Sequence, residues 1–294
     1  MPGEDALWAG LTRLPGIGPR RLSDLLNACG GPEGVWRARA AELQAVPGIS
    51  PELAERIVAA RQRTDLTTES RTLQRLGVKV LVRGRFPYPP VLASIPAAPP
   101  VLFWRGELAP GSGLAVAVVG ARRCTEAGRR LATCLAADLA QTGILVVSGL
   151  ACGIDAAAHR GCLAAGGHTI AVLGCGVDYI YPPAHSALAG QVMVKGALMS
   201  EYPPGVRPAR WHFPARNRLI SGLAVAVVVV EAGEDSGALI TARLAGEQGR
   251  QVCAYPGRVG DRMSAGCLAL IKDGAHLVCN AQDVLDILRL TGSA

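Results

Sequence analysis

The sequence FPARNRLISGL occupies positions 213–223 and is followed directly by the apolar run AVAVVVV at 224–230 and by Glu231. The run is short, rich in β-branched residues and closed by a charge, which predicts a buried parallel strand of an α/β sheet. Immediately before the strand, guanidinium groups and aromatic rings occur together, which suits a ligand that has both phosphates and bases. These side chains belong to Arg210, Trp211, His212, Phe213, Arg216 and Arg218.

The composition favours a polyanionic partner. The chain has 294 residues, 50% of them hydrophobic, and a formal net charge of +7. This length is sufficient for one large α/β domain and a smaller second domain. Arginine supplies nearly all of the positive charge, which reflects either genomic base composition or a ligand that guanidinium groups bind. The sign of the charge favours a polyanion over an acidic partner.

The cysteines and the chain start indicate a cytoplasmic protein. Nine cysteines are scattered without a CxxC pair, which favours reduced thiols, and the five histidines do not cluster with them, so no metal site is expected. The acidic start, MPGED, lacks the layout of a signal peptide. No apolar run approaches the ~18 residues needed for a membrane span.

The N-terminal part is expected to form a small helical domain at 1–66, followed by the α/β domain at 67–294. Two similar segments, LPGIGPR at 14–20 and VPGISPE at 46–52, each have a Gly-rich turn before a predicted helix. Backbone amides in such turns can approach a phosphate. The pair resembles tandem helix-hairpin-helix motifs of the SAM-like kind, found in non-specific DNA-binding modules. A helical bundle that contacts only proteins stays an alternative, since Ser50 replaces a glycine of the hairpin pattern.

Strands and helices alternate through the larger part of the chain. A strand is expected at 78–82, and the prolines between residues 87 and 100 predict extended structure and turns before 101–104. Alternation favours a doubly wound, mostly parallel sheet, with the ligand beyond the carboxyl ends of the strands where the strand order reverses. Further strands are expected at 114–119, 144–148, 169–173, 197–200, 224–230, 251–255 and 276–279. Helices are expected at 126–141, 154–165, 183–191, 237–248, 264–272 and 281–288.

The loops after these strands combine glycines with arginines. VGARR at 119–123 lacks the later glycines of the dinucleotide-binding fingerprint and has Arg122 instead. Gly-rich turns also occur at 148–155 and 174–178, and Ser236 is suited to cap the helix after the strand at 224–230. Their backbone amides could form one anion-binding floor. Tight turns alone explain each glycine, but they do not explain the arginines expected at the same edge.

A catalytic interpretation is weaker. Asp155 and His159 lie one helical turn apart and could act as an acid–base pair, with Ser148 as nucleophile. However, Ser148 is not in a GxSxG elbow, and a pair at this spacing often only braces a helix. No Walker A loop is present. We therefore expect no catalytic residues. A nucleotide-processing Rossmann enzyme that uses Asp155 and Glu231 stays the alternative, followed by a scaffold whose basic face binds acidic proteins.

Several motifs in order resemble the DNA-processing protein A (DprA, also called Smf) family. The similarity runs from about residue 86 to 288, and the N-terminal helices also fit. The motifs are SGLAxGIDxxAH at 148–159, SEYP at 200–203, FPxRNR at 213–218, VEAxxxSGALITA at 230–242 and the stretch from Gly249 to Ala275.

This resemblance implies an extended Rossmann-like fold with no nucleotide cofactor and no hydrolytic activity. It implies a homodimer that binds single-stranded DNA, protects incoming strands in natural transformation and helps to load the RecA recombinase. The family's DNA pocket falls on Arg122, Arg210, Phe213, Arg216 and Asn217. With neighbouring loop residues, the expected DNA-binding set is Gly120, Ala121, Arg122, Arg123, Ser148, Gly149, Arg210, Phe213, Arg216, Asn217, Arg218, Ser236 and Gly237.

The chain departs from the family pattern at three points. Ala121 occupies a position where serine or threonine is common, so one hydroxyl donor to phosphate is lost. Leu268 occupies a position where asparagine is common. Many members carry a C-terminal winged-helix-like domain, which is not expected in this chain.

Overall fold

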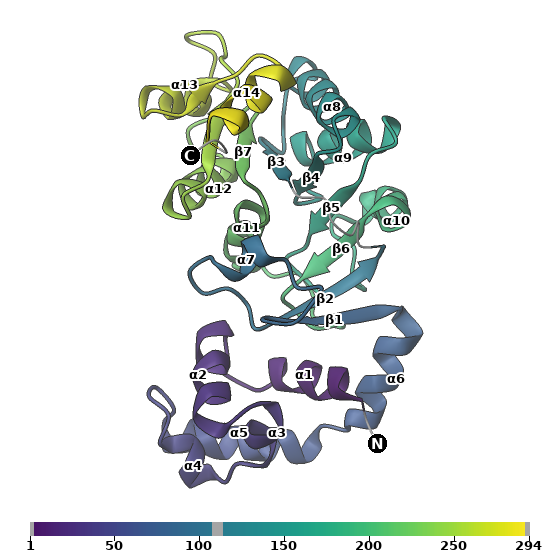
Figure 1. Ribbon diagram of the computed structural model, residues 1–294, viewed down its shortest axis with the longest axis vertical. Coiled ribbons are helices and arrows are strands. Elements are labelled where there is room, and N and C mark those ends of the chain that lie inside the picture. Colours follow the sequence, from purple (N-terminus) through teal and green to yellow (C-terminus); the bar gives the residue numbers. More distant parts are fainter. Residues whose placement is uncertain (1–2, 108–113, 292–294) are drawn as a thin grey trace.

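The N-terminal helices gather at one end of the molecule, beside the first two strands (Figure 1). The structure, a computed structural model, describes residues 3–107 and 114–291. The helices of this end are α1 (Glu4–Thr12), α2 (Pro19–Cys29), α3 (Pro32–Arg37), α4 (Ala40–Gln44), α5 (Pro51–Arg63) and α6 (Leu66–Leu76).

The two sequence-repeated turns have the same backbone geometry. Gly16 and Gly48 both adopt positive φ, 72° and 83°, and a proline begins the helix that follows each turn. Proline is favourable there because the first helical N–H has no partner within the helix. Gly16 lies against Leu53 of α5, since a Cβ at this glycine would be 2.9 Å from Cδ1 of that leucine. The two hairpins therefore pack side by side.

The helical end is joined to the rest of the molecule by a shared apolar core and by a hydrogen bond from Arg13. Leu11 and Ile57 belong to the same buried cluster as Phe103 of the second strand. Arg13 forms an ion pair with Glu69 of α6 at 2.8 Å, and its Nη2 also donates to the Pro204 carbonyl at 2.8 Å. The helices are thus anchored to a loop that lies 191 residues away in the sequence.

Within the described residues, nine strands form one sheet in the order β1-β2-β6-β5-β4-β3-β7-β8-β9. β1 and β2 pair antiparallel, β2 and β6 pair antiparallel, and the remaining pairs are parallel. The predicted doubly wound, mostly parallel sheet is confirmed. The strands are β1 (Val78–Val82), β2 (Val101–Gly106), β3 (Ala115–Val119), β4 (Leu145–Ser148), β5 (Thr169–Val172), β6 (Ala197–Ser200), β7 (Ala226–Val229), β8 (Gln251–Ala254) and β9 (His276–Leu277).

Helices cover both faces of the sheet, because alternate side chains of each strand point to opposite faces. Val116 and Val118 face α8 (Glu126–Gln141), α9 (Ile154–Ala164) and α14 (Ala281–Thr291). Ala117 and Val119 face the side covered by α7 (Pro90–Ala93), α11 (His212–Leu223), α12 (Gly237–Glu247) and α13 (Ala265–Lys272). A short 3₁₀ turn, Pro183–His185, leads into α10 (Ser186–Lys195), which lies near β5 and β6 (Figure 1).

Three helices differ from the sequence expectation. α6 lies almost entirely beyond the helical domain expected at 1–66, in a segment where no helix was expected. α7 lies within the proline-rich segment that was expected to be extended, because Pro90 occupies its first helical position, where proline costs nothing. α11 was not among the expected helices, although it contains the decisive stretch itself. Its buried side chains, Arg216, Leu219, Ile220 and Leu223, follow helical spacing.

No helix in the part of the chain that the structure describes is long and apolar enough to cross a membrane.

Candidate nucleic-acid interface

A pocket of about 970 Å³ opens at the carboxyl ends of the central strands. The chain moves outward from β3 to β4, β5 and β6 on one side, then returns to β7 on the other side of β3. The strand order therefore reverses at β3, which is where open α/β sheets bind ligands. The pocket is lined from the loops after β3, β4, β5, β7 and β8 and from the start of α11.

The β3–α8 loop packs so closely on its neighbours that no side chain fits at its own Gly120 or at Gly153 of the β4–α9 loop. The Ala121 amide donates to the Glu231 carbonyl at 2.7 Å, and a Cβ at Gly120 would be 2.6 Å from Cγ1 of Ile154. Gly153 has φ 79°, and a Cβ there would overlap the Ala121 carbonyl oxygen. This close packing fixes the backbone from which Arg122 projects.

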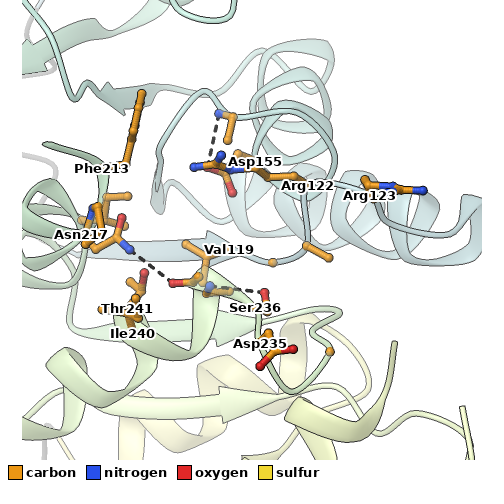
Figure 2. Close-up of a pocket in the computed structure, with 18 of the residues that line it drawn as sticks. Val119, Arg122, Arg123, Asp155, Phe213, Asn217, Asp235, Ser236, Ile240 and Thr241 are labelled. Carbon is orange, nitrogen blue, oxygen red and sulfur yellow. Dashed lines mark hydrogen bonds between the residues drawn. The ribbon is translucent and has the colours of Figure 1, made fainter. Parts of the chain in front are cut away.

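Phe213 forms the aromatic wall of the pocket. Its ring centroid lies 5.5 Å from the Arg122 guanidinium carbon and 5.5 Å from the Tyr181 ring centroid, with the two rings tilted by 39°. Gly174 makes room for it, since a Cβ at this glycine would be 3.0 Å from Cδ1 of the ring. Figure 2 shows Phe213 on the same side of the pocket as Asn217, both from α11, while Arg123 lies on the other side and points away from them.

Arg216 lies beneath the pocket and binds the backbone. Its side chain is buried, and Nη1 donates to the carbonyls of Gly149, at 2.8 Å, and Val172. Burial lowers the pKa of Arg216 to about 10, and the nearby Asp155 carboxylate opposes that shift. The guanidinium therefore ties together the ends of β4 and β5 at the pocket floor.

The structure does not bring Ser148, Gly149 or Arg218 into the pocket lining. Arg218 is two positions from Arg216 and so points to the opposite side of α11, where it pairs with buried Glu201. Ser148 is fully buried and donates to the Val118 carbonyl at 2.7 Å. The sequence indicated that these residues lie close to the pocket, but it did not indicate the direction of their side chains.

The β7–α12 loop contributes polar groups and a helix start. Ser236 Oγ accepts weakly from the Ala238 amide at 3.4 Å, and Asn217 Nδ2 donates to the Gly237 carbonyl at 3.3 Å (Figure 2). The positive end of α12 therefore faces the pocket. Glu234 and Asp235 lie on the same loop and form an acidic margin.

Sequence reasoning missed several lining residues. Tyr181 comes from the loop after β5, and Arg262 and Met263 come from the loop after β8. A usable signal existed for Arg262, because it follows a predicted parallel strand whose carboxyl end had to reach the same edge. The same signal existed for Tyr181, which follows the predicted strand at 169–173, but its role as a ring beside Phe213 became evident only from the structure.

The carboxylates of the enzymatic alternative bind the protein's own backbone. Asp155 accepts from the amides of Gly149, at 3.1 Å, and Ala151, at 3.4 Å, and burial raises its pKa. Glu231 accepts from the amide and hydroxyl of Thr125 at the start of α8. These contacts explain both carboxylates as parts of the loop framework.

The imidazole of His159 is paired with Thr169, whereas the Asp155 carboxylate is paired with backbone amides. The imidazole Nδ1 lies 2.7 Å from Thr169 Oγ1, and burial lowers the pKa of His159 to about 3. Among residues 3–107 and 114–291, no three His, Cys, Asp or Glu side chains come together in a way that could hold a metal ion.

Four pocket arginines are available to a ligand. Within the described residues, none of their side chains donates a hydrogen bond or joins an ion pair, in contrast to Arg216 and Arg218. All four are exposed, so they can move toward an anion without breaking a hydrogen bond or an ion pair inside the protein. Arg122 additionally lies over the Phe213 ring. They are Arg122, Arg123, Arg210 and Arg262.

Comparison with known proteins identifies relatives along most of the chain. The family model described as DNA recombination-mediator protein A matches residues 79–289, and the model described as a SAM-like helix-hairpin-helix tandem matches residues 9–63. Protein Smf of Synechocystis sp. is 39% identical over 286 residues, which cover 96% of this chain and 72% of that protein.

Two solved structures share the fold. The X-ray structure of DNA processing protein A (DprA) from Streptococcus pneumoniae matches with a TM-score of 0.85 at 35% identity, over 97% of this chain and 98% of that chain. DNA processing protein A from Helicobacter pylori, described by its single-stranded DNA binding mode, matches with a TM-score of 0.65 at 28% identity, over 73% and 96%. The family resemblance predicted from the motifs is confirmed.

Proposed function

Since this chain belongs to the DNA recombination-mediator protein A family, we propose that the pocket between β3 and β7 binds single-stranded DNA. The observation that carries the proposal is the Phe213 ring, held between Tyr181 and Arg122 in a pocket with four unpaired arginines. Aromatic rings stack on unpaired bases of any sequence, and guanidinium forks bind phosphates. The relative from Helicobacter pylori, described by its single-stranded DNA binding mode, supports the same ligand class.

Each group has a distinct role in this proposal. Arg122, Arg210 and Arg262 contact phosphates, and the start of α12 adds backbone amides and a positive helix end. Phe213 stacks on one base. Arg216 acts as a positioning residue, since its guanidinium already holds two strand-end carbonyls. Duplex DNA binds less well, because its bases are paired and cannot reach the ring.

We propose a binding role without catalysis. The carboxylates of Asp155 and Glu231 accept hydrogen bonds from backbone amides, and Asp155 lies beside the Arg216 guanidinium. Neither is free to act as a general base without breaking the loop framework. The protein then serves as a carrier of single strands that protects incoming DNA in natural transformation and helps to load RecA.

We also propose that the protein works as a homodimer through the C-terminal part of the α/β domain. β9 forms an edge of the sheet there, and Leu277 on that strand is exposed. An unpaired edge and an exposed apolar side chain favour association. If both pockets of a dimer bind the same DNA strand, binding of the first pocket raises the effective DNA concentration at the second, and the overall affinity increases without new contacts. A monomer at micromolar concentration in sedimentation would count against this arrangement.

The test of the proposed function is fluorescence anisotropy of a labelled oligo-dT with the purified chain, at two salt concentrations and with matched duplex as competitor. We expect tight binding that weakens with salt and that duplex competes for poorly. Absence of binding at low salt would overturn the proposal. Turnover of a nucleotide in the same pocket would replace it with the enzymatic alternative.

A further inference from the structure

Trp211 is a large aromatic side chain that the fold leaves in solvent. It is 74% exposed, whereas Trp8 and Trp104 are 5% and 1% exposed and belong to the core. Tryptophan is highly buried on average, so an exposed indole at a fixed position needs an explanation. Trp211 is outside the lining of the pocket, so the pocket as described does not provide one.

The indole is held in place by two further rings. The Trp211 and His212 ring centroids are 5.8 Å apart with an interplanar angle of 82°, and His212 stacks on Tyr202 at 4.0 Å and 25°. His212 Nδ1 also lies 3.1 Å from the Gly174 carbonyl oxygen. The edge-type contact covers little of the indole, so the ring is supported and still accessible. A ring supported in this way loses little conformational entropy when a ligand stacks on it.

Trp211 is continuous with the pocket along the chain. Arg210, the residue before it, lines the pocket, and Phe213 follows two positions later. A turn in which the His212 amide donates to the Ala209 carbonyl at 3.0 Å sets the direction of the chain as it enters α11. A strand whose phosphate contacts Arg210 therefore passes the indole when it leaves the pocket.

The charges around Trp211 favour a nucleic acid over a protein as its partner. Arg207 and Arg210 precede Trp211 by four residues and by one residue, both are exposed, and neither side chain has a hydrogen-bond or ion-pair partner in the described ranges. A docking surface for an apolar protein segment would instead place further apolar side chains beside the indole. Unpaired cations next to an exposed ring match the alternating phosphates and bases of a single strand.

We propose that Trp211 is a second stacking surface, which binds the base of a single-stranded DNA nucleotide just outside the pocket. This inference rests on the proposed function and adds a subsite to it. Phe213 holds one base inside the pocket, Arg210 contacts the phosphate between the two sites, and Trp211 holds a second base outside.

The first test compares Trp211→Ala and Trp211→Phe with the unmodified chain in oligo-dT titrations. Stacking on one base contributes ~1–3 kcal/mol, and each 1.4 kcal/mol is tenfold in affinity. We expect Trp211→Ala to weaken binding by about 5- to 140-fold, and Trp211→Phe to retain most of the affinity. Phe86→Ala is the matched control, since Phe86 is 94% exposed and follows an arginine but lies in the β1–α7 segment. That control should bind like the unmodified chain.

A second titration separates stacking from a structural role. An oligonucleotide of equal length whose sugars carry no bases offers the phosphates but nothing to stack on. Trp211→Ala should bind this abasic strand as well as the unmodified chain does. Equal weakening on both strands would overturn the inference, because it would indicate a displaced α11. Quenching of tryptophan emission by oligo-dT, lost in Trp211→Phe, would support it.

The outcomes also separate the inference from the proposed function. If the unmodified chain binds oligo-dT and Trp211→Ala binds it equally well, the second subsite is refuted and the pocket proposal stands. If the unmodified chain does not bind oligo-dT at all, the pocket proposal fails and the subsite fails with it. Binding of an acidic protein that Trp211→Ala abolishes, without DNA binding, would assign the indole to a protein partner instead.

Discussion

Arginines near the site should differ sharply in their effect on salt dependence. Arg210 is exposed and has no hydrogen-bond or ion-pair partner among the described residues, whereas Arg218 forms a buried ion pair with Glu201. Arg210→Ala therefore removes a cation that is available to DNA. Arg218→Ala removes a cation that the protein already uses. Both are arginines of the same sequence stretch, so only their surroundings distinguish them.

The structure sets the size of each effect. Each phosphate contact with a single strand contributes about 0.7 to the slope of log affinity against log salt. The three arginines proposed to contact phosphates predict a slope of about −2, and hence an affinity loss of about 20-fold between roughly 50 and 200 mM salt. Arg210→Ala should reduce the slope to about −1.4 and the loss to about 7-fold. Arg218→Ala should keep the slope but lower the stability by about 3–5 kcal/mol, because Glu201 is left buried without its partner.

Anisotropy titrations of labelled oligo-dT across a salt series measure the slope, and urea unfolding measures the stability. Arg122→Ala should repeat the result for Arg210→Ala. The reasoning is refuted if Arg210→Ala leaves the slope unchanged. It is equally refuted if Arg218→Ala flattens the slope and leaves the stability intact.

Three further predictions concern the ring, the loop and pH. Phe213→Ala should weaken oligo-dT binding by ~1–3 kcal/mol at every salt concentration without changing the slope of log affinity against log salt. A titration that shows a loss of only a few tenths of a kcal/mol would refute stacking on this ring. Gly153→Ala should destabilise the chain in urea and weaken binding, because its Cβ would overlap the Ala121 carbonyl; Gly166→Ala, at a similar φ of 78° in open space, should cost only the backbone strain. The pKa of His159 is lowered from its ordinary 6.5 to about 3, so its neutral form contributes stability above about pH 6.5 that is lost as the pH falls toward 3. His159→Asn should flatten that dependence in urea unfolding, and an unchanged profile would assign it to other groups.

The sheet could be predicted because its central strands are buried on both faces. Runs such as 224–230 are then continuously apolar, and their spacing reveals the helices between them. Observed strand limits differ from the expected ones by one or two residues at several ends. α11 was missed because its arginines and Asn217 dominate the stretch. The buried face of α11 contains Arg216 beside Leu219 and Ile220. This face can be recognised only when the carbonyls that bind the Arg216 guanidinium are known.

The site could be predicted in its position and only partly in its composition. Loops at 119–123 and 236–237 meet because neighbouring parallel strands end at one edge of the sheet. Whether each arginine is paired inside the protein or exposed could not be predicted, since this depends on partners that are distant in the sequence. Glu201 follows β6, and the carbonyls that bind Arg216 belong to Gly149 and Val172. No local pattern carries this information.

Charged side chains inside the protein fix the positions of the loops and strand ends around the pocket. Arg216 joins the ends of β4 and β5, Glu231 joins the end of β7 to the start of α8, and Arg13 joins the helical end to the Pro204 carbonyl in the loop that leads to Arg210. Such groups are expensive to desolvate, and their value is a fixed geometry rather than extra stability. A ligand that meets a fixed pocket loses less binding energy to ordering of the protein. Arg216, Glu231 and Arg13 therefore fix the loops from within, and the exposed arginines have no partner that would compete with the phosphates of the proposed ligand.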